Sequence, residues 1–223
     1  MTHIPEGPEK PFYGILDPIE RISEVLFGVI MALTFTCTLG VATANGIQVK
    51  TMLIAALGCN LAWGIIDAGV YLIARVHVQG RNIMTLRAVR TAADAQAARR
   101  IIADALPPAL AAVVSEEQLD QMRHRLLSTV DEPTHPHLTK RDWLAGLGVC
   151  LLCFLSTFPV AAPFMIVGDA RTALRASNAV AVVLLFFCGY AFGHRTGLSP
   201  WVSGLFMVVF GGTLVGVAIA LGG

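Results

Sequence analysis

The chain has 223 residues, of which 55% are hydrophobic and only 14% are charged, and its mean hydropathy is +0.68. Soluble domains carry about a quarter charged residues, so this composition excludes an ordinary soluble globular protein. The formal net charge is only +1. It excludes the strongly basic surface that nucleic-acid binding needs, and we therefore expect no nucleic-acid partner.

Five apolar stretches follow one another along the chain, each close to the length of a membrane-spanning helix. About twenty predominantly apolar residues cross a hydrocarbon core of about 30 Å. We therefore predict an all-α integral membrane protein with five transmembrane helices in the lipid bilayer. The spans are expected at residues 22–44, 52–74, 143–167, 179–193 and 201–221.

The first two spans carry acidic residues, and ionisable groups at membrane depth mark functional sites. Glu20 and Glu24 share one helical face near the start of the first span. Asp67 lies in the second span, about 12 Å from its cytosolic end. Because carboxylate oxygens suit hard and borderline divalent cations, Glu24 and Asp67 are candidate metal ligands. Each residue also has a structural alternative. In these, Glu20 lies in interfacial water, Glu24 snorkels to the interface, and Asp67 bonds to a hydroxyl group or to Trp63.

Two further residues extend this candidate pathway. Asn60 lies near the middle of the second span, where its amide is either a carbonyl-oxygen ligand or an interhelical hydrogen-bonding group. Met31 lies one heptad beyond Glu24 and offers a soft sulfur donor, although membrane methionines usually serve packing. The predicted transport pathway therefore consists of Glu20, Glu24, Met31, Asn60 and Asp67.

A polar stretch, residues 76–142, separates the second and third spans. The positive-inside rule places it in the cytosol together with the N-terminus, which leaves only 3 of the 16 lysines and arginines outside. We expect three parts: residues 1–75 with the first two spans, 76–142 as a cytosolic helical insertion, and 143–223 with the last three spans. The C-terminus is then outside, and a bacterial inner membrane is the expected location.

The insertion has two helical patterns. Apolar residues at helical spacing predict one helix over 83–106, which Pro107 and Pro108 end. Residues 115–118 have the spacing of a capping box and predict a second helix to about residue 130. Acidic and histidine side chains of this region form a candidate cytosolic metal site, for which the alternative is a solvated surface. They are Glu116, Glu117, Asp120 and His124, with His135 and His137 in the following loop.

The later spans contain cysteine, proline and glycine patterns. All five cysteines lie in apolar spans, so no disulfide framework is expected, and Cys150 and Cys153 are interpreted as packing residues rather than half a zinc site. Pro159 and Pro163 either free backbone carbonyls inside the membrane or only kink the third span. Glycine pairs at 189/193 and 212/216 predict close helix contacts, within the bundle or in a dimer.

Three stretches resemble the vacuolar iron transporter (VIT) family. GHRTGLSPWVSGL at 193–205, followed by glycines at 211 and 212, resembles that family's final loop and fifth span. FPVAAPF at 158–164 is similar to its proline-paired third span, and IAALGCNLA at 54–62 resembles the start of its second span. Five spans with a cytosolic helical insertion between the second and third also match the family's layout.

The resemblance implies a homodimeric transporter that exports divalent iron or manganese from the cytosol in exchange for protons. The cation, Fe²⁺ or Mn²⁺, is the substrate, and no permanently bound cofactor is expected. The chain departs from the family as a divergent member of bacterial type: the first span has Glu24 where the family has an Asp-Gly pair. The second span has Asp67 and Val70-Tyr71 in the region of the family's Met and Glu-Tyr.

Two classes of function follow from the sequence. The first is a metal/proton antiporter that uses the acidic residues of the first two spans. The alternative is a non-transporting membrane sensor or scaffold on a degenerate transporter fold, which the departures from the family pattern favour. An enzyme is not expected, because the sequence has neither a nucleophile–base pair nor a tight metal motif.

Overall fold

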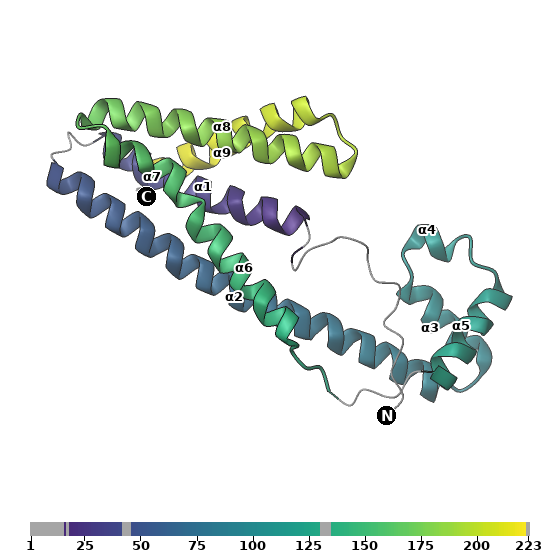
Figure 1. Cartoon of the computed structure of the whole chain (residues 1–223). Coiled ribbons are helices and arrows are strands. Elements are labelled where there is room, and N and C mark those ends of the chain that lie inside the picture. The colour runs from purple at the N-terminus through teal and green to yellow at the C-terminus, as the bar shows by residue number, and fades with distance from the viewer. Residues whose placement is uncertain (1–15, 17, 42–45, 130–134, 222–223) are drawn as a thin grey trace. The chain divides into compact units, whose positions relative to one another are not determined.

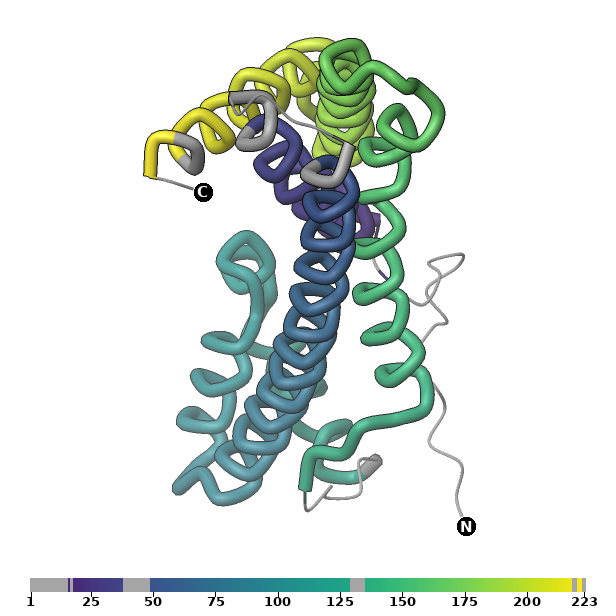
Figure 2. The backbone as a smooth tube through the Cα atoms, turned by 90° about the vertical axis from the view of Figure 1, so that its left-hand side faces the viewer, coloured from purple at the N-terminus to yellow at the C-terminus, as the bar shows by residue number. Residues whose placement is uncertain are grey.

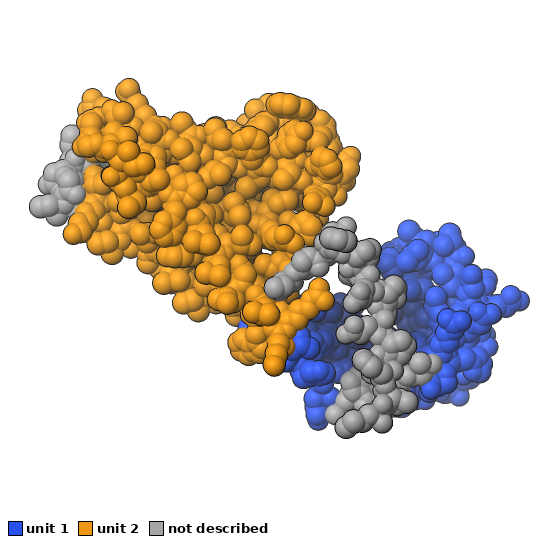
Figure 3. Space-filling model, in the orientation of Figure 1, with its two compact units in different colours: residues 1–11, 72–139 blue, residues 12–71, 140–223 orange. Residues whose placement is uncertain are grey.

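The computed structural model describes residues 16, 18–41, 46–129 and 135–221, and the regular elements among them are helices. The chain divides into two compact units (Figure 3). Unit 1 comprises Met1–Pro11 and Leu72–Thr139, and unit 2 comprises Phe12–Tyr71 and Lys140–Gly223. The predicted three-part division at residues 75 and 142 stays a prediction.

Unit 2 contains the long apolar helices (Figure 1). They are α1 (Pro18–Val41), the first part of α2 (Gly46–Thr91), α6 (Lys140–Leu155), α7 (Thr157–Ile166), α8 (Ala170–Thr196) and α9 (Pro200–Ala220). α1 packs against α6, α7, α8 and α9, and α8 and α9 lie side by side. Small and branched apolar side chains fill the core between them: Val29, Ala32, Leu33, Val160, Ala181, Leu185 and Val215.

Four stretches of the described helices are long and apolar enough to cross a membrane. They are Val49–Thr91, Lys140–Ile166, Ala170–Thr196 and Pro200–Val217, and they correspond to the second to fifth predicted spans. α1 has 24 residues but is not one of the four, and its first two turns carry Glu20, Arg21 and Glu24. The chain is therefore an integral membrane protein with four candidate spans, and α1 as a fifth span is part of the proposal below.

Two predicted boundaries are wrong. α2 does not end near residue 74 but continues without a break to Thr91, as the smooth tube of Figure 2 shows. Hydropathy detects the end of the apolar stretch, whereas good helix formers such as Arg, Leu and Met carry the helix onward. α8 begins at Ala170 rather than near residue 179, because the Asp169 carboxylate accepts hydrogen bonds from Thr172 N at 2.8 Å and Thr172 Oγ1 at 2.6 Å.

The third predicted span consists of two helices, α6 and α7, separated at Ser156. Pro159 has no N–H to donate to the carbonyl of Leu155, and its ring clashes with that carbonyl in a continuous helix. α6 therefore ends at Leu155, and the Ser156 hydroxyl donates to the Cys153 carbonyl oxygen at 2.7 Å. Pro159 thus breaks the helix rather than only bending it, whereas Pro163 lies inside α7.

The predicted glycine contacts occur at one of the two pairs. A Cβ at Gly189 would lie 2.6 Å from Met207 Cβ, and a Cβ at Gly193 would lie 3.0 Å from Pro200 Cα. These glycines of α8 therefore allow the close approach of α9, which confirms packing within the bundle. At Gly212 and Gly216 a Cβ would meet no atom of the described residues within 4 Å, so their part in a dimer stays a prediction.

Unit 1 contains the second part of α2, α3 (Ala95–Ala105), α4 (Pro108–Ala111) and α5 (Glu116–Thr129). The predicted capping box is confirmed: Gln118 N donates to Ser115 Oγ at 3.3 Å, and Ser115 N donates to Gln118 Oε1 at 2.9 Å. Apolar residues of α2, α3 and α5 share a small core, which consists of Val89, Ala98, Ile102 and Leu119.

The single helix predicted over residues 83–106 is wrong. α2 ends at Thr91 and α3 begins at Ala95, with Asp94 as its N-cap. The Asp94 carboxylate accepts a hydrogen bond from Ala97 N at 2.7 Å, which satisfies one of the free N–H groups at the start of α3. The apolar spacing continues across the break, so periodicity alone did not reveal it.

Candidate functional site

α1, α2 and α6 approach one another closely at two glycines of unit 2. A Cβ at Gly28 of α1 would overlap Ser156 Oγ and the carbonyl oxygen of Cys153. A Cβ at Gly64 of α2 would lie 2.8 Å from the carbonyl oxygen of Cys150. Both contacts are made with backbone atoms of α6, so the absence of a side chain sets how closely the three helices meet.

The acidic residues predicted for the pathway lie one turn from these glycines. Glu24 precedes Gly28 by four residues on α1, and Asp67 follows Gly64 by three residues on α2. Both carboxyl side chains are half-buried, and their negative charges lie close enough to repel each other. Glu20 adds a further negative charge to this group. The structure therefore brings together three of the predicted residues, from two different helices.

Asn60 lies at the junction of the helices and is 0% exposed. Its Nδ2 donates to the Gly28 carbonyl oxygen at 3.2 Å and to Thr157 Oγ1. Its Oδ1 has no hydrogen-bonding partner among the described residues. An unsatisfied buried acceptor costs about 1–3 kcal/mol, so both alternatives considered for Asn60 retain support: the amide N–H₂ joins helices, and the carbonyl oxygen is free to accept.

Two other residues belong to the sequence predictions for this site. Met31 was predicted to lie on the pathway, and Trp63 was the alternative partner of Asp67. Met31 is half-buried on α1, two turns beyond Glu24, and its role stays a prediction. Trp63 contacts Phe27 edge to face, with ring centroids 5.8 Å apart. Its indole N–H also interacts with the Cys59 thiol. These contacts give Trp63 a packing role between α1 and α2.

Two residues of α6 were not singled out by the sequence. Asp142 is a carboxylate only 4% exposed, in the first turn of α6, where the sequence analysis placed the end of the insertion. Cys153 is 0% exposed, and its thiol donates to the backbone carbonyl oxygen of Asn60 at 3.7 Å. The position of an acid next to an apolar span was a signal for Asp142. The sequence set Cys153 apart only as one of the pair Cys150 and Cys153, and it predicted a packing role for both.

The candidate cytosolic metal ligands lie on α5 of unit 1. Asp120 Oδ1 is 3.0 Å from Arg123 Nε and 3.5 Å from Arg99 Nη1, and Arg99 Nη2 is also 3.8 Å from Glu116 Oε2. The hydrogen bond from Arg123 is the main cause that lowers the pKa of Asp120, and the charges of Arg123, Arg99 and His124 add to it. Nowhere in the described part of the chain do three or more His, Cys, Asp or Glu side chains form a group placed to hold a metal ion.

Because Asp120 of α5 is joined to α3 through Arg99, at 3.5 Å, we expect Asp120→Asn to loosen this helix pair. Amide hydrogen exchange measured on the full-length protein should become faster in α3 and α5. Asp104→Asn, an exposed acid of α3, is the matched control and should leave the exchange unchanged. If divalent metal protected α5 from exchange in the wild-type protein but not in Asp120→Asn, Asp120 would be a metal ligand rather than a structural residue.

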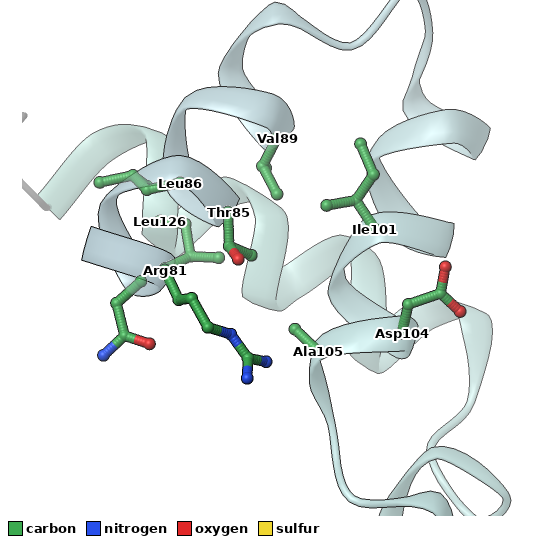
Figure 4. A pocket seen from close by; sticks show the side chains of 9 residues that line it. Arg81, Thr85, Leu86, Val89, Ile101, Asp104, Ala105 and Leu126 are labelled. Atoms are coloured by element: carbon green, nitrogen blue, oxygen red, sulfur yellow. The ribbon is translucent and has the colours of Figure 1, made fainter. Parts of the chain in front are cut away.

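Unit 1 also contains a cavity of about 410 Å³ (Figure 4). Of the residues that line it, Arg81 comes from α2, Asp104 and Ala105 come from α3, and Leu126 comes from α5. An apolar hollow of about 330 Å³ shares Thr85, Ala105 and Leu126 with it. Arg81 and Asp104 have opposite charges, and no group of like-charged or metal-binding residues lines the cavity. We therefore place the candidate site at the carboxylates of unit 2.

A comparison with known protein families matches residues 22–223 to the VIT family. The match covers nearly all of the described residues and includes Glu24, Asn60, Asp67 and the helix junction. No curated protein matches the chain.

Proposed function

The chain belongs to the VIT family, a family of iron and manganese transporters, and on this premise we propose that it carries Fe²⁺ or Mn²⁺ out of the cytosol in exchange for protons. The observation that carries the proposal is the meeting of Glu24 and Asp67, carboxylates of different helices, within range of each other's charge. Members of the family are transporters and not enzymes, so we assign these acids a binding role.

The chemistry of the acidic group supports this function. Like charges that repel each other at membrane depth are stabilised when a cation enters between them. Carboxylate oxygens suit borderline divalent ions such as Mn²⁺ and Fe²⁺. The same oxygens also bind protons, so a proton and a metal ion compete for them. Such competition is the minimum requirement for exchange, with Glu20 at the entrance and Asn60 and Met31 further along the path.

The proposal includes the membrane topology. We propose α1 as the first of five spans, because its charged residues lie within its first two turns and the rest of the helix is apolar. A cytosolic N-terminus puts the arginine-rich insertion in the cytosol and the C-terminus outside, as the positive-inside rule favours. Residence in a bacterial inner membrane and assembly as a homodimer belong to the same proposal.

The test is a flux assay on the purified protein in proteoliposomes. Fe²⁺, Mn²⁺ or Co²⁺ is added on one side while a metal-sensitive dye and a pH-sensitive dye report on the lumen. We expect accumulation of at least one ion together with proton movement in the opposite direction, both absent from protein-free vesicles. If neither metal nor pH changes, transport is refuted and the sensor or scaffold function is favoured. Metal accumulation without proton movement would refute exchange alone.

A further inference from the structure

We propose a second cation site at the junction of α1, α2, α6 and α7. There the side-chain oxygen Oδ1 of Asn60 and the Cys153 thiol bind a thiophilic divalent ion such as Cd²⁺, Co²⁺ or Zn²⁺ in preference to Mn²⁺. Its role as a step on the path rests on the proposed function, whereas binding itself can be measured without transport. The site differs from the carboxylate group in its ligands, which are a side-chain amide oxygen and a thiol.

The first observation is the free acceptor of Asn60. Both hydrogen-bonding directions of its Nδ2 are used by the Gly28 carbonyl oxygen and Thr157 Oγ1. These bonds fix the amide, because a carbonyl oxygen such as that of Gly28 can only accept. The Oδ1 is thereby held in a fully buried position without a partner among the described residues. A cation that binds this oxygen would remove its desolvation cost.

The second observation is the position of the Cys153 thiol. The side chain is 0% exposed, and its thiol makes a long contact of 3.7 Å with the backbone carbonyl oxygen of Asn60. The thiol also lies within range of the charges of Glu24 and Asp67. It therefore occupies the same neighbourhood as the free amide oxygen and the acids, at the level where Gly28 lets α1 meet α6.

The donor set decides which ion fits. The described residues contain no cluster of three or more His, Cys, Asp or Glu side chains placed for metal binding, so a closed zinc-type cage is not what this junction offers. It offers one thiol, one amide oxygen and the hydroxyl oxygen of Ser156, whose hydrogen donates to the Cys153 carbonyl. Sulfur favours thiophilic ions, whereas Mn²⁺ prefers carboxylate and water oxygens.

Binding changes the protonation of the thiol. The Cys153 S–H bond breaks as the sulfur–metal bond forms, and the proton is released to water, because the thiolate and not the thiol is the metal ligand. No electron is transferred. Each bound ion therefore releases a proton at this site, which links metal binding to pH.

The experiment is a titration of the purified, detergent-solubilised full-length protein with Cd²⁺ and with Co²⁺. A thiolate-to-metal charge-transfer band in the ultraviolet reports sulfur ligation directly. We expect the band in the wild-type protein and its loss in Cys153→Ser, with Cd²⁺ affinity lower by about tenfold or more. Cys188→Ser, a buried cysteine of α8, is the matched control and should retain the band. Cys153→Ala provides a second test if the serine variant fails to fold.

The outcomes separate this site from the transport proposal. A band in wild-type protein that transports no ion would support the site and refute transport. Transport without a band, or a band that persists in both Cys153 variants, would refute the site and leave transport standing. In proteoliposomes we expect Cys153→Ser to lose Cd²⁺ flux while Mn²⁺ flux remains. An equal loss of both fluxes would show that Cys153 acts through packing and not as a selective ligand.

Discussion

Asp67→Asn and Glu24→Gln are each expected to reduce metal flux in proteoliposomes to the level of protein-free vesicles. The amides keep the size of the side chain but remove the charge that attracts a divalent ion. At an effective dielectric constant of about 20, a unit charge pair about 4 Å apart contributes about 4 kcal/mol. Loss of even half of that weakens binding about thirtyfold.

The thermal stability of these variants distinguishes a functional role from a structural one. Glu24 and Asp67 repel each other in the folded protein, so removal of one charge should leave the melting temperature in detergent unchanged or raise it. A residue that serves function at the expense of stability behaves in this way. Asp169→Asn is the control, since Asn also caps helices and Asp169 lies outside the pathway. Normal flux in both pathway variants would reject this pathway.

Gly28→Ala is expected to destabilise unit 2 strongly. The new methyl group would overlap both Ser156 Oγ and the carbonyl oxygen of Cys153. The hydroxyl can rotate away, but the carbonyl belongs to the backbone of α6, so α1 and α6 must separate. Overpacking typically costs about 1–3 kcal/mol and outweighs the gain of about 1 kcal/mol that Ala brings over Gly in a helix. Thermal unfolding in detergent measures the difference.

The control for Gly28→Ala is Gly58→Ala, a helical position of α2 where a Cβ meets nothing within 4 Å among the described residues. That substitution should leave the melting temperature unchanged or raise it. A double variant, Gly28→Ala with Ser156→Ala, removes one of the two clashes and should recover only part of the lost stability. If Gly28→Ala alone proved as stable as Gly58→Ala, the close approach of α1 and α6 would be incorrect.

The sequence was most informative where one local property decides the structure. The fifth span, predicted at residues 201–221, is α9 (Pro200–Ala220), because an apolar stretch in lipid must satisfy its own backbone hydrogen bonds as a helix. The capping box at Ser115 was found for the same reason, since its two hydrogen bonds join neighbouring residues. Helix ends set by a single polar residue, Asp94 and Asp169, were missed because hydropathy does not register them.

In the candidate site, too, the sequence revealed some features and only the structure revealed the others. Glu24, Asn60 and Asp67 stood out in the sequence because polar groups at membrane depth are costly and therefore few. The sequence could not show that Glu24 and Asp67 come within range of each other's charge, or that the Asn60 amide bonds to α1 and α7 while its oxygen remains free. Those facts depend on which faces of separate helices meet, and no local pattern encodes that meeting.

By itself, the sequence determined that this protein lies in a membrane and that it is helical. It also determined which polar side chains cost free energy at membrane depth and are therefore candidates for a pathway. These conclusions follow from the transfer free energy of individual residues and from local hydrogen bonding. Tertiary structure alone decided that Gly28 and Gly64 let three helices approach. It also decided that Cys153, one cysteine of five, contacts Asn60 and lies within range of the charges of the two acids. Such proximity arises from packing between residues far apart in the chain, and each contact depends on the others.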